Sequence, residues 1–221
     1  MVAAPPSESE PRLRCWRCKE ASPPAFFCPH CEAVQTLPSD SNYSALFGFG
    51  GGPAVDEDTL SQRYYDLSRR LHPDRFQTGS PEEQRASLQA TALLNTAFKT
   101  LRDVESRGRW WLEREGEALG RDNNQVPPAL AGLVFEVQEQ IEEASHASGE
   151  ARGKIVEQLE RTKAELNQQR DEERATVEKL LQEWPEDEAR AASSREELKR
   201  RLSELSYLRT LTRDVGRALE D

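Results

Sequence analysis

Apolar residues recur at intervals of three and four along an arginine-rich stretch in the first third of the chain. These positions are Leu60, Tyr64, Leu67 and Leu71. Such a stripe is typical of one face of an amphipathic helix. Asp56 is placed to cap the start of this helix, because a short carboxylate can accept hydrogen bonds from the free N–H groups of the first turn. The helix must end near His72, because Pro73 disfavours helical geometry at the preceding residue and has no N–H.

A second helix is predicted immediately downstream. The run Ser80-Pro81-Glu82-Glu83 has the pattern of a capping box with proline at the first helical position. The apolar residues that follow at helical spacing are Ala86, Ala90, Leu93, Leu94, Ala97, Phe98 and Leu101, and the helical pattern continues without a break to Leu112. Two helices joined by a short loop should form an antiparallel hairpin. A short helix at residues 43–47 is expected to pack against it.

Three further apolar stripes follow a loop predicted at residues 121–128. The first contains Leu130, Leu133, Val134, Val137 and Ile141. The second contains Ile155, Leu159 and Leu166 and continues to Val177, Leu180, Leu181 and Trp184. The third contains Leu198, Leu202, Leu205, Leu208, Leu211, Val215 and Leu219. Since this half has no strand-like alternation, we expect an antiparallel three-helix bundle with connections near Ser148-Gly149 and Pro185.

Charge narrows the classes of partner that the chain can have. The 221 residues carry a formal charge of −10, which argues against nucleic acid as the main partner, because phosphate contacts need a basic surface. Residues 60–76 nevertheless contain four arginines and two aspartates, a local charge of +2 that favours docking to an acidic protein. No apolar run approaches the ~20 residues of a membrane span.

The four cysteines of the chain form two C-x-x-C pairs, Cys15 with Cys18 and Cys28 with Cys31. Two such knuckles can supply the four thiolates of a tetrahedral, structural Zn²⁺ site. A pair of disulfides is the alternative, but the N-terminal residues lack a secretion signal. A redox C-x-x-C would not need the second pair. His30 lies between two ligand cysteines and could replace one of them, although four thiolates already complete the shell.

The helical hairpin with its loop resembles the J-domain, the module with which co-chaperones stimulate DnaK-class ATPases. The residues that carry the resemblance are His72, Pro73 and Asp74, continued by Arg75 and Phe76, behind a helix that bears Arg63, Arg69 and Arg70. A J-domain followed by a three-helix bundle is similar to the HscB family of iron–sulfur cluster biogenesis. The tetracysteine module resembles the N-terminal zinc domain of eukaryotic members of that family.

The resemblance implies a co-chaperone and not an enzyme. The residues expected to bind the chaperone, a DnaK-class or HscA-class ATPase, are His72, Pro73, Asp74, Arg63, Arg69 and Arg70. The bundle would bind the iron–sulfur scaffold IscU and deliver it to that ATPase. Carried over by position, the scaffold-binding residues are Phe135, Glu136, Glu139 and Tyr207.

Alternatives remain open for the bundle. The two carboxylates could be ordinary exposed side chains, and Tyr207 could belong to the bundle core. The family usually has leucine and methionine where this chain has Ala131 and Gly132. A general J-domain adaptor that recruits a different client is therefore the second hypothesis. A zinc-dependent nucleic-acid-binding protein is the third, although only four basic residues lie near the cysteines.

The sequence as a whole predicts an all-α protein with a small tetracysteine module in front. We expect a disordered tail at residues 1–13, a zinc module at 14–38, a J-domain at 41–112, a linker at 113–128 and the bundle at 129–221. The N-terminal residues also lack the composition of a mitochondrial transit peptide. A cytoplasmic protein is the simplest interpretation, with the mitochondrial matrix as the alternative.

Overall fold

The computed structural model describes residues 12–117, 119 and 126–220. The predicted disordered tail falls almost wholly outside these residues, as does most of the loop predicted at 121–128. The chain divides into two compact units, Met1–Arg107 and Gly108–Asp221, which are described separately here. Both are predominantly helical, as expected from the sequence. Within the described residues, no helix is long and apolar enough to cross a bilayer.

The first unit begins with the cysteine module. Its strands β1 (Leu13–Arg14) and β2 (Ala21–Ser22) form a short antiparallel pair, and an isolated bridge joins Phe27 to Val34. Leu13 is therefore part of a strand and does not belong to a disordered tail. The short helix α1 (Tyr43–Leu46) follows, capped by the Asn42 side chain.

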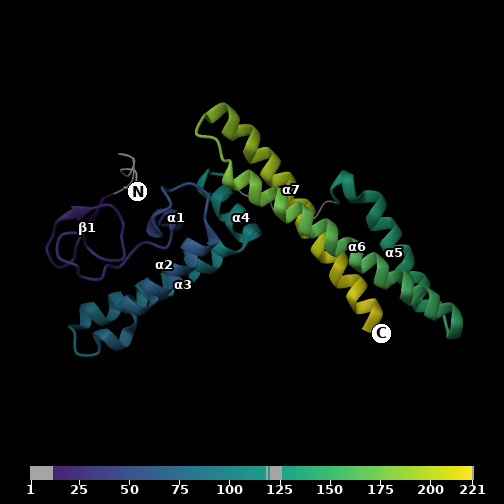
Figure 1. Ribbon diagram of the computed structural model, residues 1–221, viewed down its shortest axis with the longest axis horizontal. Helices are drawn as coiled ribbons and strands as arrows, with labels where there is room; N and C mark the ends of the chain where they lie inside the picture. The colour runs from purple at the N-terminus through teal and green to yellow at the C-terminus, as the bar shows by residue number, and fades with distance from the viewer. Residues whose placement is uncertain (1–11, 118, 120–125, 221) are drawn as a thin grey trace. The chain divides into compact units, whose positions relative to one another are not determined.

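Two antiparallel helices, α2 (Glu57–Leu71) and α3 (Pro81–Arg102), form the hairpin of the first unit (Figure 1). The Asp56 side chain accepts from the N–H of Thr59, and the complete capping box of Ser80 and Glu83 is present. Between the helices, residues Pro73–Phe76 form the 3₁₀ turn η1. Both predicted caps are thus confirmed, because each helix starts where a side-chain oxygen can satisfy a free N–H.

The prediction of one continuous helix from Pro81 to Leu112 is wrong, because the structure has two helices there. The chain leaves helical geometry at Asp103, with φ −89° and ψ 118°, before helix α4 (Val104–Arg114) begins. The Asp103 carboxylate accepts from the N–H of Ser106 at 2.9 Å, which is the contact of an N-terminal cap. A local capping interaction therefore replaces one long helix by two, and the division between the units falls inside the second.

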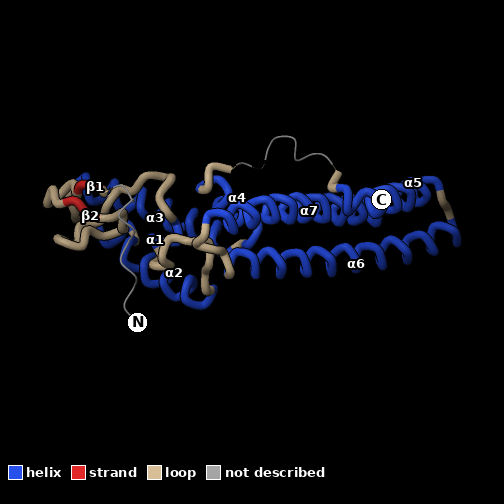
Figure 2. Tube along the Cα trace, turned by 90° about the horizontal axis from the view of Figure 1, so that it is seen from above, coloured by secondary structure: helices blue, strands red, loops and turns tan. Residues whose placement is uncertain are grey.

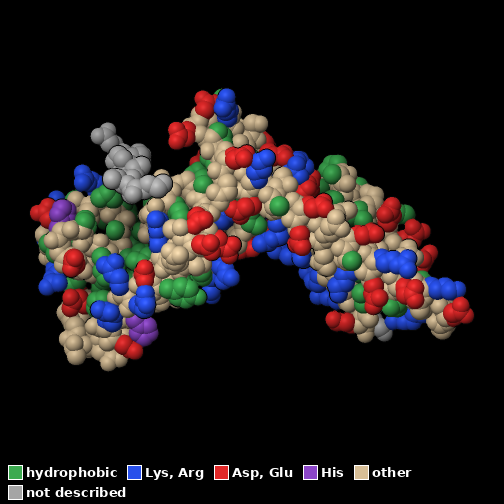
Figure 3. All heavy atoms as spheres, in the orientation of Figure 1, with side chains coloured by type: hydrophobic (Ala, Val, Ile, Leu, Met, Phe, Trp, Pro, Cys, Tyr) green, Lys and Arg blue, Asp and Glu red, His purple; other side chains and the backbone are tan. Residues whose placement is uncertain are grey.

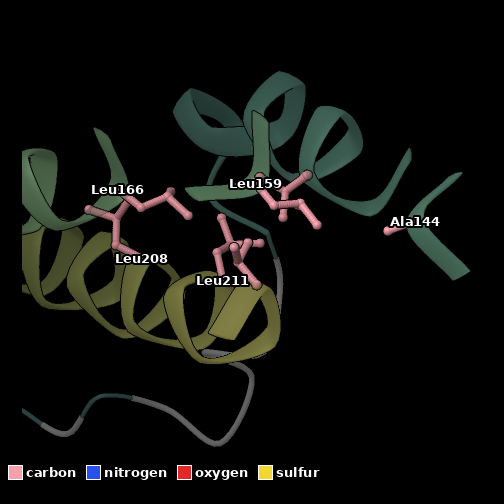
Figure 4. Close-up of a cluster of buried hydrophobic side chains, with 7 residues drawn as sticks. Ala144, Leu159, Leu166, Leu208 and Leu211 are labelled. Carbon is pink, nitrogen blue, oxygen red and sulfur yellow. The ribbon is translucent and has the colours of Figure 1, made fainter. Parts of the chain in front are cut away.

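The second unit contains helices α5 (Ala131–His146), α6 (Gly149–Gln182) and α7 (Glu188–Glu220), preceded by the 3₁₀ turn η2 (Pro128–Leu130). The predicted connections near Ser148-Gly149 and Pro185 are confirmed. Figure 2 shows α6 and α7 running side by side, while the shorter α5 accompanies only part of them. At that end, Leu159 and Leu166 of α6 point toward Leu208 and Leu211 of α7 in a shared core (Figure 4).

The other end of the α6–α7 pair is covered by α4. A Cβ atom at Gly108 would lie 3.2–3.3 Å from methyl groups of Leu198 and Leu202, so the absent side chain allows the helices to approach closely. The indole ring of Trp111 meets that of Trp184 edge-on at 5.7 Å between centroids. The bundle core is therefore completed by α5 at one end and by α4 at the other.

Candidate functional site

The histidine–proline–aspartate corner lies where α2 ends. His72 has φ −54° and ψ 129°, outside helical geometry, and Pro73 occupies the first position of η1. The Nδ1 atom of His72 accepts from the backbone N–H of Asp74 at 3.3 Å and lies 3.5 Å from its carboxylate. The His72 and Asp74 side chains are 56% and 72% exposed.

Side chains of helix α3 hold the residue that precedes this exposed corner. The Leu71 carbonyl, at the end of α2, accepts from the hydroxyl of Ser87 at 2.7 Å and from that of Thr91 at 3.1 Å. Leu71 and Ser87 are both fully buried. A helix end leaves carbonyl oxygens without helical partners, and a buried one must find a donor. The two hydroxyls meet that need and fix the residue that precedes His72.

The three arginines predicted to bind the chaperone are exposed, and each has a partner within the first unit. Arg63 donates to the Phe47 carbonyl, and its Cζ lies 4.9 Å from the centre of the Phe49 ring. Arg69 pairs with Asp66. The Cζ of Arg70 lies over the ring of Phe27, 4.2 Å from its centre. Figure 3 shows basic side chains gathered over the hairpin next to a histidine.

The four cysteine thiols meet at one point of the first unit. Their Sγ atoms all lie within 4.8 Å of one another. Cys15 with Cys31, and Cys18 with Cys28, are 3.7 Å apart between Sγ atoms, beyond the length of a disulfide bond. His30 is exposed and stands outside this cluster.

Both knuckles have the same backbone conformation. Lys19 and Glu32, each directly after the second cysteine of a pair, have left-handed φ values of 67° and 58°. Their N–H groups donate to the carbonyls of Cys15 and Cys28, at 3.0 and 2.9 Å. A non-glycine residue rarely adopts this conformation, so the turns store a small strain in order to aim two thiols inward. The residues present fit a tetrahedral metal ion.

Cys15 and Cys18, the thiols of the first knuckle, differ in how readily they ionise. Burial opposes ionisation of Cys15, but the N–H groups of Cys18 and Arg17 and the neighbouring thiols outweigh it and lower its pKa to about 6. At Cys18 a backbone hydrogen bond from Glu20 favours the thiolate, yet burial and the three other thiols raise its pKa to about 12. One thiolate therefore forms readily and the next is disfavoured, which is the electrostatics of a site that suits a divalent cation.

The predicted scaffold-binding residues of α5 lie on the surface of the second unit. The ring of Phe135 is 68% exposed, and Glu136 and Glu139 are exposed beside it. Tyr207 of α7 is half-buried, whereas its neighbour Leu208 belongs to the buried core. Phe135 is thus a large exposed apolar side chain with carboxylates one and four residues after it on the same helix.

Sequence reasoning missed three contributors to these sites. Ser87 and Thr91 carry a usable signal, because two hydroxyls four residues apart lie on the face of α3 that meets the end of α2. The contact of Phe27 with Arg70 had no signal, because it joins residues from different modules.

Comparison with known proteins assigns the family. No protein-family model matches the chain. The human iron–sulfur cluster co-chaperone protein HscB is 32% identical over 155 residues, which cover 68% of this chain and 65% of that protein. The crystal structure of human HscB has a TM-score of 0.67 and 26% identity, covering 92% of this chain and 97% of the solved one. The chain belongs to the HscB family.

The match to the human HscB sequence spans 65% of that protein's length. HscB from Vibrio cholerae has a TM-score of 0.59 with 22% identity and covers 81% of this chain, which shows the same fold.

Proposed function

We propose that this protein is a co-chaperone of iron–sulfur cluster assembly that stimulates the ATPase of a DnaK-class or HscA-class chaperone. The observation that carries the proposal is the exposed His72–Asp74 corner, held by the buried hydroxyl of Ser87 at the tip of a rigid hairpin. The arginines of α2 would attract an acidic surface of the ATPase, and the corner would make the directional contacts. The ATP chemistry belongs to the chaperone.

We further propose that the bundle presents an IscU-type scaffold to the chaperone. Support comes from Phe135, an exposed aromatic ring next to the carboxylates of Glu136 and Glu139. A large apolar side chain with a charged rim has the composition of a binding hot spot. Tyr207 of α7 is proposed as a further contact of the same surface.

The metal at the cysteine cluster is proposed to be Zn²⁺ in a structural role. Four soft thiolates in two knuckles are the preferred shell for this ion, and they leave no position for a catalytic water. Metal binding to such small modules contributes about 10–16 kcal/mol to folding. The metal content of purified protein, measured by mass spectrometry, should be one zinc per chain and should fall in Cys28→Ser; iron in its place would contradict the assignment.

The ATPase rate of a purified DnaK-class chaperone, with and without IscU, tests the main proposal. We expect stimulation by the protein, and a larger stimulation when IscU is also present. His72→Gln should abolish both effects without loss of helical structure by circular dichroism. His146→Gln is the matched control, because His146 is an exposed histidine at the end of α5. Stimulation that survives His72→Gln would refute the proposal.

A general adaptor for another client remains the second candidate. Ala131 and Gly132 are both exposed at the start of α5, next to the proposed scaffold surface. These small side chains offer little apolar area to a scaffold protein. Stimulation that is equal with and without IscU would favour this candidate and leave the role of the corner intact.

A further inference from the structure

Two contacts connect the cysteine module with the hairpin inside the first unit. The ring of Phe27 lies under the guanidinium of Arg70 on α2, with 4.2 Å from Cζ to the ring centre. Arg17, between the first two cysteines, lies 3.8 Å from the carboxylate of Glu83 on α3. The module therefore touches both helices of the hairpin, and one contact is made to an arginine of the proposed docking surface.

The cysteine cluster itself holds Phe27 in place. Phe27 directly precedes Cys28, a buried thiol of the cluster, and its backbone forms a bridge with Val34. On either side of it, the Phe26 carbonyl accepts from the N–H of Gln35, and the N–H of Cys28 donates to Ala33, both at 2.9 Å. The ring is thus mounted on the turn that the metal would close, and its position depends on that turn.

The stack leaves the polar part of Arg70 available. A guanidinium over an aromatic ring uses its face, whereas its N–H donors lie in its plane. Arg70 is exposed and lies two residues before His72. Arg63 and Arg70 both lie over a ring, but Arg63 also donates to a carbonyl, and Arg69 donates to a carboxylate. The ring can therefore order the Arg70 side chain while its N–H donors stay available to the chaperone.

We propose that Phe27 is a positioning residue that orients Arg70 for the chaperone, so that metal loading of the cysteine module sets the affinity of the docking surface. The inference rests on the proposed co-chaperone function and concerns how the metal regulates binding at the same docking surface. An arginine side chain loses considerable rotamer freedom when it is fixed by a partner. A ring that fixes it beforehand lowers that entropic cost and tightens binding.

The test measures the affinity of the full chain for a purified DnaK-class chaperone in its ATP-bound state by calorimetry. Phe27→Leu keeps an apolar side chain but removes the aromatic face, and we expect binding about two- to five-fold weaker, the size of an exposed cation–π contact. Phe27→Trp keeps an aromatic face and should restore binding to at least the original affinity. The zinc content of each variant should equal that of the original protein.

A double-mutant cycle separates positioning from a general loss of structure. In an Arg70→Gln background, Phe27→Leu should have no further effect, because the two residues act through one contact. In an Arg69→Gln background, Phe27→Leu should weaken binding by the same factor as in the original protein. Equal effects of Phe27→Leu in both backgrounds would overturn the proposal.

Removal of the metal gives a second readout that does not depend on ATPase activity. The side-chain Nε–H signal of Arg70 in a ¹⁵N spectrum should show a rigid group in the zinc-loaded protein and a mobile one after chelation. Chelation should weaken chaperone binding in the original protein and have a smaller effect in Arg70→Gln. An Nε–H signal that chelation leaves unchanged would overturn the metal link.

The outcomes distinguish this inference from the proposed function. Absence of any binding by the original protein, together with unstimulated ATPase, would mean that the co-chaperone proposal itself is wrong. Normal binding and stimulation that are lost in His72→Gln but unchanged in Phe27→Leu would leave the co-chaperone in place and refute only the role of Phe27.

Discussion

Removing the two hydroxyls beneath the proposed docking corner should cost more together than the sum of the separate changes. Ser87→Ala deletes the 2.7 Å hydrogen bond to the Leu71 carbonyl but leaves the 3.1 Å bond from Thr91. Thr91→Val deletes the second bond and leaves the first. Either single variant therefore keeps one donor on the buried carbonyl, and only the double variant removes both.

The expected losses of stability follow from the free energy of leaving a buried acceptor without a donor. A single buried hydrogen bond contributes about 1 kcal/mol, so each single change should reduce stability by roughly that amount. A buried carbonyl without a donor costs about 1–3 kcal/mol in addition. Since Leu71 is fully buried, water cannot easily replace the hydroxyls. We expect the double variant to be about 3–5 kcal/mol less stable, with a coupling of at least ~1 kcal/mol.

Amide hydrogen exchange along α2 measures this effect locally in the full chain, because protection reports the free energy of opening. Thr96→Val is the matched control, because its hydroxyl donates to Ala92 on the exposed side of the same helix. The control should change protection by less than ~0.5 kcal/mol. Additivity of the two inner changes within ~0.5 kcal/mol would refute the idea that the hydroxyls share one acceptor.

Three further predictions concern the second unit. Gly108→Leu should destabilise it by about 1–3 kcal/mol in urea denaturation, because the side chain must enter the contact with α7, whereas Gly153→Leu, in open space on α6, should be neutral or stabilising. Hydrogen bonds from Arg200, and then from Arg201, hold the pKa of Glu197 below its usual 4.5. That contribution is present above pH 4.5 and is lost as pH falls below it, so the urea midpoint should drop on acidification, and less steeply in Glu197→Gln. Phe135→Ser should lower affinity for IscU at least ten-fold in a binding titration while the urea midpoint stays unchanged, because the ring is 68% exposed; a lowered midpoint would contradict a purely binding role.

Local signals accounted for most of what the sequence predicted correctly. The caps at Asp56 and Ser80 are interactions within four residues, so a short pattern contains all that determines them. The four thiols could be grouped because spacing alone brings each pair together, and a second pair then completes the shell. The stripes of the bundle were readable because each helix buries one face over many turns.

What could not be predicted depends on contacts between distant residues or on competition between close alternatives. At Asp103 the apolar period continues, so only the three-dimensional structure shows that the aspartate caps a new helix. The stacking of Phe27 with Arg70 is set by how the module sits on the hairpin, which no local pattern contains. Each of the three arginines of α2 looks like a free charge in the sequence, yet each has a partner within the first unit.

The covering of the bundle from both ends has a consequence for the order of folding. Helix α7 packs against α5 and α6 in the shared core and against α4 through Gly108. Yet it follows all three in the chain, and Glu115 of the α4 side meets Arg195 across 80 residues. During synthesis, α5 can already pack against α6, but the contact of α4 through Gly108 and the α7 part of the shared core form only after α7 has been made. Until then the nascent chain exposes apolar surface of the kind that promotes aggregation.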